Sequence, residues 1–166
     1  VFGAATLVAA FSLAPRLIRA QQPIEPQTIV RSWKTVNRRA TVIDSGGRKF
    51  VRLDEGPTMG LVWTPFDFTD GEIELDLRGR DVLQKSFLGI AFHIESDTAF
   101  DAVYLRPFKH LKVVVRGNDV SAFVNGTGSP ALHVQGLSGR SRGGVGLWVG
   151  DPSPGEFANL VVRPGK

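Results

Sequence analysis

The sequence predicts an all-β fold, a jelly-roll sandwich of two antiparallel sheets. Residues 71–106 hold three runs of strand-forming residues, each bounded by Gly, Asp, Ser or Pro. Nineteen glycines and ten prolines are spread along the 166 residues, where they indicate turns between short strands. After residue 20, no segment of useful length shows a helical period. About eleven short strands, roughly 8–12 residues apart, are typical of a sandwich or jelly roll.

The N-terminal part of the predicted sandwich consists of short strands. A hairpin turn is expected at Ser45-Gly46-Gly47, because a glycine pair tolerates the backbone of a tight hairpin. Residues 65–71 are expected to form a loop that leads into the central strands. The strands predicted before that loop are 33–36, 39–44, 49–53 and 59–63.

The central strand is predicted at residues 71–78, where polar and apolar residues alternate without a break. Ile73, Leu75 and Leu77 fall on one face of this strand, and the charged residues fall on the other. The later strands are predicted at 86–94, 100–106, 110–116, 120–124, 131–134, 145–149 and 156–162, with a turn at 117–119 and a polar loop at 139–144.

Residues 1–20 differ from the rest of the chain. They are apolar and uncharged up to Ala14, which is about the length of a signal-peptide core and too short to span a bilayer comfortably. We predict a truncated export signal over 1–20, a linker over 21–29 and a β-sandwich domain over 30–163. The protein would then be periplasmic or extracellular, with no stable membrane span after signal removal. The alternative for 1–20 is a short membrane-anchoring or surface helix.

Composition limits the chemistry and the partners. The chain has no cysteine, which excludes disulfides, thiolate zinc sites and cysteine nucleophiles. Its formal net charge is +4, and removal of residues 1–20 takes away two arginines and no acid, which leaves +2 (4 − 2). Residues 31–52 hold seven basic groups against one acid, but only Trp33 and Phe50 are near them as stacking aromatics. A nucleic-acid partner is therefore not expected, and the oligomeric state stays open.

Several short motifs occur in a characteristic order over roughly residues 30–162. They are Phe68-x-x-Gly71-Glu72-Ile73-Glu74-Leu75-Asp76, Gly89-Ile90-Ala91-Phe92, Asp101-Ala102-Val103-Tyr104-Leu105-Arg106-Pro107-Phe108, Leu111-Lys112-Val113-Val114-Val115, Val124-Asn125-Gly126, Gly144-Val145-Gly146-Leu147-Trp148-Val149-Gly150 and Phe157-Ala158-Asn159-Leu160. Their order and spacing resemble the concanavalin A-like jelly-roll proteins of the 3-keto-disaccharide hydrolase domain family. LamG-like relatives of that family are often labelled family 16 glycoside hydrolase-like.

The resemblance implies an exported, carbohydrate-active sandwich. The most specific activity that it implies is hydrolysis of a 3-keto-glycoside. The alternative is a non-catalytic glycan-binding or cell-surface interaction module of LamG type, and a third possibility is a purely structural sandwich. Relatives usually carry a longer segment after the Arg-Pro-Phe motif, whereas here Arg106-Pro107-Phe108 runs almost directly into His110. Either the chain has lost that segment or the connection is a tight hairpin. The missing loop favours binding over catalysis.

Glu72, Glu74 and Asp76 form a carboxylate row on one strand face, with neighbours ~7 Å apart. Glycosidases need two such groups, ~5–5.5 Å apart for retention and ~6.5–9.5 Å for inversion. The row resembles the start of the family 16 catalytic strand, but Arg78 and Gly79 stand where a second Glu would follow. Family 16 chemistry is therefore not expected, and the row is interpreted as an exposed face with Arg78 as its counter-charge.

Tyr104 and Arg106 are expected to share one strand face, with Asp101 pointing the other way. An aromatic ring and a guanidinium on a concave sheet suit a sugar, because the ring stacks on a pyranose face and the guanidinium donates to hydroxyls. His93 could meet this pair if the strands are adjacent, and Trp148 could add a second platform. Tyr104, Arg106, His93 and Trp148 are thus the candidate ligand-binding residues, and His93, Asp101 and Arg106 are the catalytic candidates. Each also has a structural interpretation, in the core or in an ion pair.

Oxygen ligands for a cation are present but scattered. Asp97, Asp101 and Asn118-Asp119 could serve calcium, although they form no dense ligand pattern. No histidine pair has metal-ligand spacing. No cofactor is expected other than this calcium possibility, and carbohydrate is the expected partner.

Overall fold

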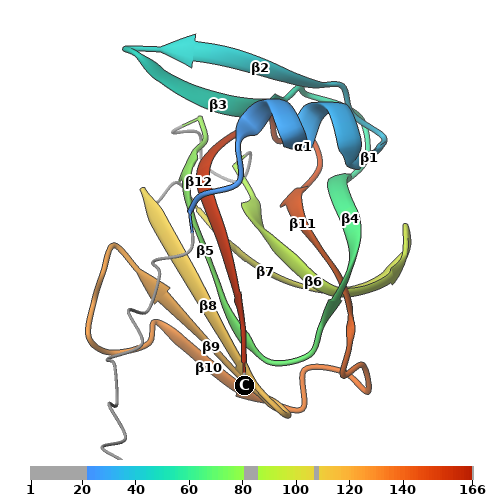
Figure 1. Ribbon diagram of the computed structural model, residues 1–166, viewed down its shortest axis with the longest axis vertical. Helices are drawn as coiled ribbons and strands as arrows, with labels where there is room; N and C mark the ends of the chain where they lie inside the picture. The colour runs from blue at the N-terminus through green and yellow to red at the C-terminus, as the bar shows by residue number, and fades with distance from the viewer. Residues whose placement is uncertain (1–21, 81–85, 107–108, 166) are drawn as a thin grey trace, which may run out of the picture.

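The computed structural model describes residues 22–80, 86–106 and 109–165. It confirms the predicted all-β class, because two antiparallel sheets face each other as a sandwich (Figure 1). The five-stranded sheet has the order β1 (Lys34–Val36), β4 (Gly60–Phe68), β11 (Gly143–Val149), β6 (Leu88–Ser96) and β7 (Ala99–Leu105). The seven-stranded sheet has the order β10 (Leu132–Gln135), β9 (Asp119–Val124), β8 (His110–Arg116), β5 (Gly71–Arg78), β12 (Gly155–Pro164), β3 (Arg48–Leu53) and β2 (Ala40–Ser45).

The hydrophobic core lies between the two sheets. Ile73, Leu75 and Leu77 of β5 are buried in it, which confirms the face predicted from the alternation of that strand. The five-stranded sheet contributes a row of paired residues from neighbouring strands to the same core. That row is Val62, Leu147, Ile90 and Val103.

The predicted hairpins are also present. Ser45 pairs with Arg48 across the turn between β2 and β3, and Gly46 and Gly47 both have positive φ, as a tight turn of this kind requires. Strands β8 and β9 pair as a second hairpin, with Arg116 opposite Asp119.

One short helix corrects the prediction of a linker over 21–29. Helix α1 spans Pro26–Ser32 and begins with a proline, which is tolerated in the first helical turn. Ile29 of α1 is only 2% exposed and belongs to the core, and the Ile24 N–H donates to the Leu160 carbonyl at 2.7 Å. In Figure 1, α1 lies beside β2 and β3, so this segment closes one end of the sandwich. Seven residues are too few to show a helical period, which explains the wrong prediction.

The end of one strand and the connection between two others differ from the sequence prediction. Strand β4 continues to Phe68, so most of the loop expected at 65–71 is strand. Strands β7 and β8 belong to different sheets, so the connection between them is not a hairpin. Pro107-Phe108 and the predicted export signal at 1–20 lie outside the described residues. Among the described residues, the structure holds no helix with the length and apolar character needed to cross a membrane.

Candidate functional site

The outer face of the five-stranded sheet carries aromatic side chains. Strand pairing aligns one residue from each of the five strands across this face. The aligned residues are Val36, Leu61, Trp148, Gly89 and Tyr104. Residues opposite one another in a sheet point to the same side, so this row faces away from the core row described above. We call the side chains of Trp63, Phe87, Tyr104 and Trp148 the aromatic face.

Gly89 brings two of these rings together. It lies on β6 between Trp148 of β11 and Tyr104 of β7, and it has no side chain to separate them. The Tyr104 and Trp148 ring centroids are 4.9 Å apart with an interplanar angle of 34°. A Cβ atom on Gly89 would lie 2.6 Å from the Cα of Tyr104. Only glycine therefore allows the two rings to meet across β6.

The aromatic face is accessible and supported from below. Tyr104 is 51% exposed, whereas Trp148 and Phe87 are partly buried. Phe87 meets the Tyr104 ring edge-on, with centroids 5.9 Å apart. Beneath the rings, a small apolar cluster of Leu61, Ala91 and Ile94 is buried on this side of the sheet. The exposed Tyr104 ring, backed by partly buried rings and a packed base, therefore offers an apolar surface to a ligand.

Trp63 is held in place by polar contacts at the edge of the aromatic face. Its indole Nε1–H donates to Asp97 at 3.0 Å, and Lys34 donates to the other carboxylate oxygen at 2.6 Å. The Lys34 hydrogen bond, together with that from Trp63, holds the pKa of Asp97 below its usual range. This arrangement fixes the indole plane and leaves a charged pair beside it.

Arg106 follows the last residue of β7, and its side chain is exposed. Regular alternation places Ala102 and Tyr104 on the outer side and Asp101 and Val103 on the inner side, as predicted. That alternation ends at Leu105. The strand pairing thus joins Tyr104 to Trp148, while Arg106 lies beyond the paired residues.

His93 does not face Tyr104, which corrects the expected grouping. The β6 register shifts between Phe92 and Ser96, and His93 adopts a positive φ of 48° within this bulge. The bulge turns the imidazole inward, where it is 2% exposed and its Nε2–H donates to the Thr69 carbonyl at 2.8 Å. Strand periodicity assumes an unbroken strand, so it could not place this residue.

Asp101 joins His93 in a buried polar network. Its carboxylate lies 3.4 Å from His93 Nδ1 and accepts a hydrogen bond from the Ser138 hydroxyl at 2.8 Å. Arg140 approaches the second oxygen at 3.5 Å. Asp101 is 7% exposed. The serine donates to the aspartate and not to the histidine, so these three groups do not have the order of a nucleophile activated by a base.

The carboxylate row of β5 is neutralised by neighbouring strands. Arg163 of β12 pairs with Glu74 at 2.6 Å, and Asp76 accepts hydrogen bonds from Arg48, from His110 at 2.8 Å and from Asn159 at 2.9 Å. Burial alone would raise the pKa of Asp76, but these donors outweigh it and hold the pKa below the usual value.

Arg78, the counter-charge expected for this row, pairs with Glu156 instead. The strand register determines the partner of Arg78, because Glu156 is opposite Arg78 on the adjacent strand.

No group of three or more His, Asp or Glu side chains is placed to hold a metal ion within residues 22–80, 86–106 and 109–165. Two of the oxygen ligands considered for calcium are engaged elsewhere, Asp97 with Lys34 and Trp63, and Asp101 with Ser138.

The structure brings together Tyr104 and Trp148, which were both candidates from the sequence, and adds Gly89 and Phe87, which were not. The signal for Gly89 was a glycine inside an otherwise apolar strand, which often marks a close approach.

The fold is shared with several solved structures. The carbohydrate binding module CBM66 from Bacillus subtilis is 17% identical, with a TM-score of 0.58 over 79% of this chain and 94% of that one. A protein of unknown function with a galectin-like fold, also from Bacillus subtilis, is 13% identical, with a TM-score of 0.59 over 87% and 94%. A legume lectin-like domain from Entamoeba histolytica is 11% identical, with a TM-score of 0.52 over 88% and 96%. No protein-family model and no curated protein matches the chain in sequence.

These similarities define the class of fold, a sandwich of two antiparallel β-sheets that is shared with galectin-like and legume lectin-like structures. At such low identities they describe the architecture alone, and function has to be argued from the residues of this chain.

Proposed function

We propose that this protein is a carbohydrate-binding β-sandwich module, and that a glycan stacks on its aromatic face. The observation that carries the proposal is the contact between the exposed Tyr104 ring and the Trp148 ring, 4.9 Å apart over Gly89. An aromatic ring offers a large apolar surface at a small entropic cost, which suits the C–H face of a pyranose. The Tyr104 hydroxyl and the Lys34–Asp97 pair beside Trp63 supply polar groups for sugar hydroxyls.

The neighbours support this chemistry by their own descriptions, since one is a carbohydrate binding module and another a legume lectin-like domain. Export stays part of the proposal and rests on the sequence of residues 1–20, which would place the module in the periplasm or outside the cell.

Binding fits the site better than turnover. Hydrolysis of a 3-keto-disaccharide is implied only by the family resemblance of the motifs. Its catalytic candidates His93 and Asp101 are buried, with His93 Nε2 bonded to the Thr69 carbonyl and Asp101 to Ser138, while a glycosidase needs carboxyls that reach the scissile bond. A stacked glycan needs only the exposed Tyr104 ring and the accessible part of its neighbour Trp148.

The test is calorimetric titration of the full chain with plain glucans and with 3-keto-glycosides. We expect Tyr104→Ala and Trp148→Ala each to weaken binding about tenfold to a hundredfold, because each removes roughly 100 Å² of apolar contact. Leu132→Ala is the matched control, since Leu132 is an exposed apolar residue on the other sheet. It should leave the affinity unchanged.

Product analysis on the same samples separates binding from catalysis. Release of a free sugar that Arg106→Ala abolishes would contradict the binding-only proposal and support the hydrolase. Equal loss of affinity in Leu132→Ala and Tyr104→Ala would rule out the aromatic face as the site.

A further inference from the structure

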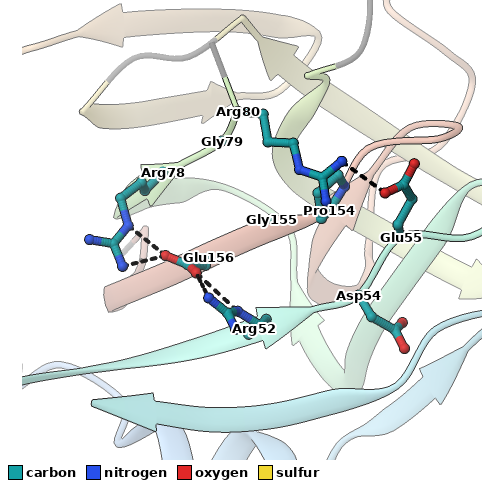
Figure 2. Close-up of a pocket in the computed structure, with 9 residues that line it drawn as sticks. All are labelled: Arg52, Asp54, Glu55, Arg78, Gly79, Arg80, Pro154, Gly155 and Glu156. Atoms are coloured by element: carbon teal, nitrogen blue, oxygen red, sulfur yellow. Dashed lines mark hydrogen bonds and ion pairs between the residues drawn. The ribbon is translucent and has the colours of Figure 1, made fainter. Parts of the chain in front are cut away.

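A cavity opens on the outer face of the seven-stranded sheet, on the opposite side of the sandwich from the aromatic face. Its volume is about 490 Å³. Figure 2 shows Glu156 of β12 between Arg52 of β3 and Arg78 of β5. The three residues are direct cross-strand partners, with Glu156 opposite Arg52 on one side and opposite Arg78 on the other. Strand register therefore fixes their order.

Glu156 is fully engaged by the two arginines. One carboxylate oxygen accepts from Arg52 Nε at 3.0 Å and Nη2 at 2.5 Å, and the other accepts from Arg78 Nε at 2.5 Å. Burial favours the neutral acid, but the two guanidinium groups outweigh it and hold the pKa of Glu156 below its usual value. Both arginine side chains remain about half exposed. Arg78 Nη1 also donates to Ser45 Oγ at 3.3 Å, and each guanidinium, with five N–H donors, keeps others for a ligand.

The opposite wall of the cavity repeats this pairing of donor and acceptor. Arg80 donates to Glu55 at 2.8 Å, and Asp54 stands next to Glu55 along the chain (Figure 2). Arg80 and Glu55 are both about half exposed, so their polar atoms reach the solvent of the cavity.

Charge and composition select the kind of ligand. The lining contains three arginines and three acids, so its formal charge is zero (3 − 3). No aromatic ring belongs to the lining, which otherwise consists of Gly79, Pro154 and Gly155. A neutral lining gives an anion or cation little net attraction, and the lack of a ring offers no stacking surface. Alternating guanidinium donors and carboxylate acceptors match hydroxyl groups, each of which can accept one hydrogen bond and donate another.

We propose that this cavity is a second binding site, which holds a compact neutral polyhydroxyl ligand by adjacent hydroxyl groups. The ligand is either the terminal residue of a glycan or a free sugar alcohol, which share this chemistry. Arg52 and Arg78 donate to two neighbouring hydroxyl oxygens, and Glu55 accepts from the hydroxyls on the other side, where Asp54 Oδ1 already accepts the Arg39 N–H at 2.8 Å. This site does not depend on the aromatic face.

The experiment is a nuclear magnetic resonance titration of the full chain, read from the arginine Nε–Hε signals. The probes are the methyl glycosides of glucose, mannose and galactose for a terminal sugar, and sorbitol for a free polyol. We expect at least one probe to shift the Arg52 and Arg78 signals with saturation in the millimolar range. The probe that binds tells the two sources apart.

Conservative variants test the role of the guanidinium fork. Arg78→Lys and Arg52→Lys keep the charge but lose the planar fork, and each should weaken binding about tenfold. Arg163→Lys is the matched control, because Arg163 forms a comparable ion pair with Glu74 on the same sheet but does not line the cavity. It should change the affinity less than about twofold.

Three outcomes would overturn the proposal: no shift with any of the four probes, equal weakening by Arg163→Lys, or binding of glucuronate or sulfate where the neutral probes fail. Tyr104→Ala should leave the titration unchanged. Failure of this titration would therefore not count against glycan binding at the aromatic face. Failure of the glycan titration at the aromatic face would not count against this cavity.

Discussion

At the scale of single residues, Gly89 determines the geometry of the aromatic face. A Cβ atom at this position would approach the Val103 carbonyl oxygen at 2.1 Å and Tyr104 Cα at 2.6 Å, both backbone atoms that cannot move aside cheaply. We expect Gly89→Ala to lower the free energy of unfolding by about 2 kcal/mol and to separate the two rings. Urea denaturation and glycan titration of the same variant measure both effects.

The control for this substitution is Gly128→Ala, since an added Cβ atom at Gly128 meets nothing within 4 Å. It should change neither the free energy of unfolding nor the affinity for a glycan. A Gly89→Ala variant that unfolds and binds like the wild type would show that the rings do not depend on the glycine.

His93 is the second residue whose setting is unusual, because it combines burial with a positive φ. Its removal leaves the Thr69 carbonyl without its donor and opens space beside Phe68 and Phe92. We expect His93→Ala to reduce the free energy of unfolding by about 2–3 kcal/mol in urea denaturation. The exposed His133 gives the control variant His133→Ala, which should stay within about 0.5 kcal/mol. Wild-type stability of His93→Ala would contradict the structural role.

At the scale of elements, strands β3, β12 and β5 are joined by the Arg52–Glu156–Arg78 ion pairs. The folded-state pKa of Glu156 is lowered, so its contribution to stability is fully present above the unfolded pKa of about 4.3 and is lost as the pH falls from there through the lower folded-state pKa. We expect Glu156→Gln to lower the free energy of unfolding at pH 6 and to have a much smaller effect at pH 3. Chemical denaturation at the two pH values measures the difference.

Glu55→Gln serves as the comparison for this pH effect. Glu55 also pairs with an arginine, but both side chains of that pair are about half exposed, and such surface pairs contribute little to stability. Its effect should be small at both pH values. An equal loss for Glu156→Gln at pH 3 and pH 6 would show that charge is not what Glu156 contributes.

At the scale of the whole molecule, the sandwich separates its two proposed sites. Tyr104 lies on the five-stranded sheet and Arg78 on the seven-stranded sheet, and the buried core lies between the inner faces of the two sheets. We expect the stability changes of Tyr104→Ala and Arg78→Lys to add within about 0.5 kcal/mol in the double variant, as is usual for distant sites. Thermal or urea unfolding of the four proteins completes the cycle, and a larger coupling would mean that the two faces communicate.

The sequence determined the local features of this protein. Alternation placed Ile73, Leu75 and Leu77 in the core, and the glycine pair at 46–47 predicted the β2–β3 hairpin. The opposite orientations of Asp101 and Tyr104 also followed from period two alone. These features depend on neighbours along the chain, which a single sequence displays directly.

Only the tertiary structure decided which distant strands become neighbours. It set Gly89 between Tyr104 and Trp148, Glu156 between Arg52 and Arg78, and the bulge that turns His93 inward. It also placed Ile29 in the core through a helix too short to show a period. Strand order and register arise from pairing between residues tens of positions apart, and local patterns carry no information about that pairing.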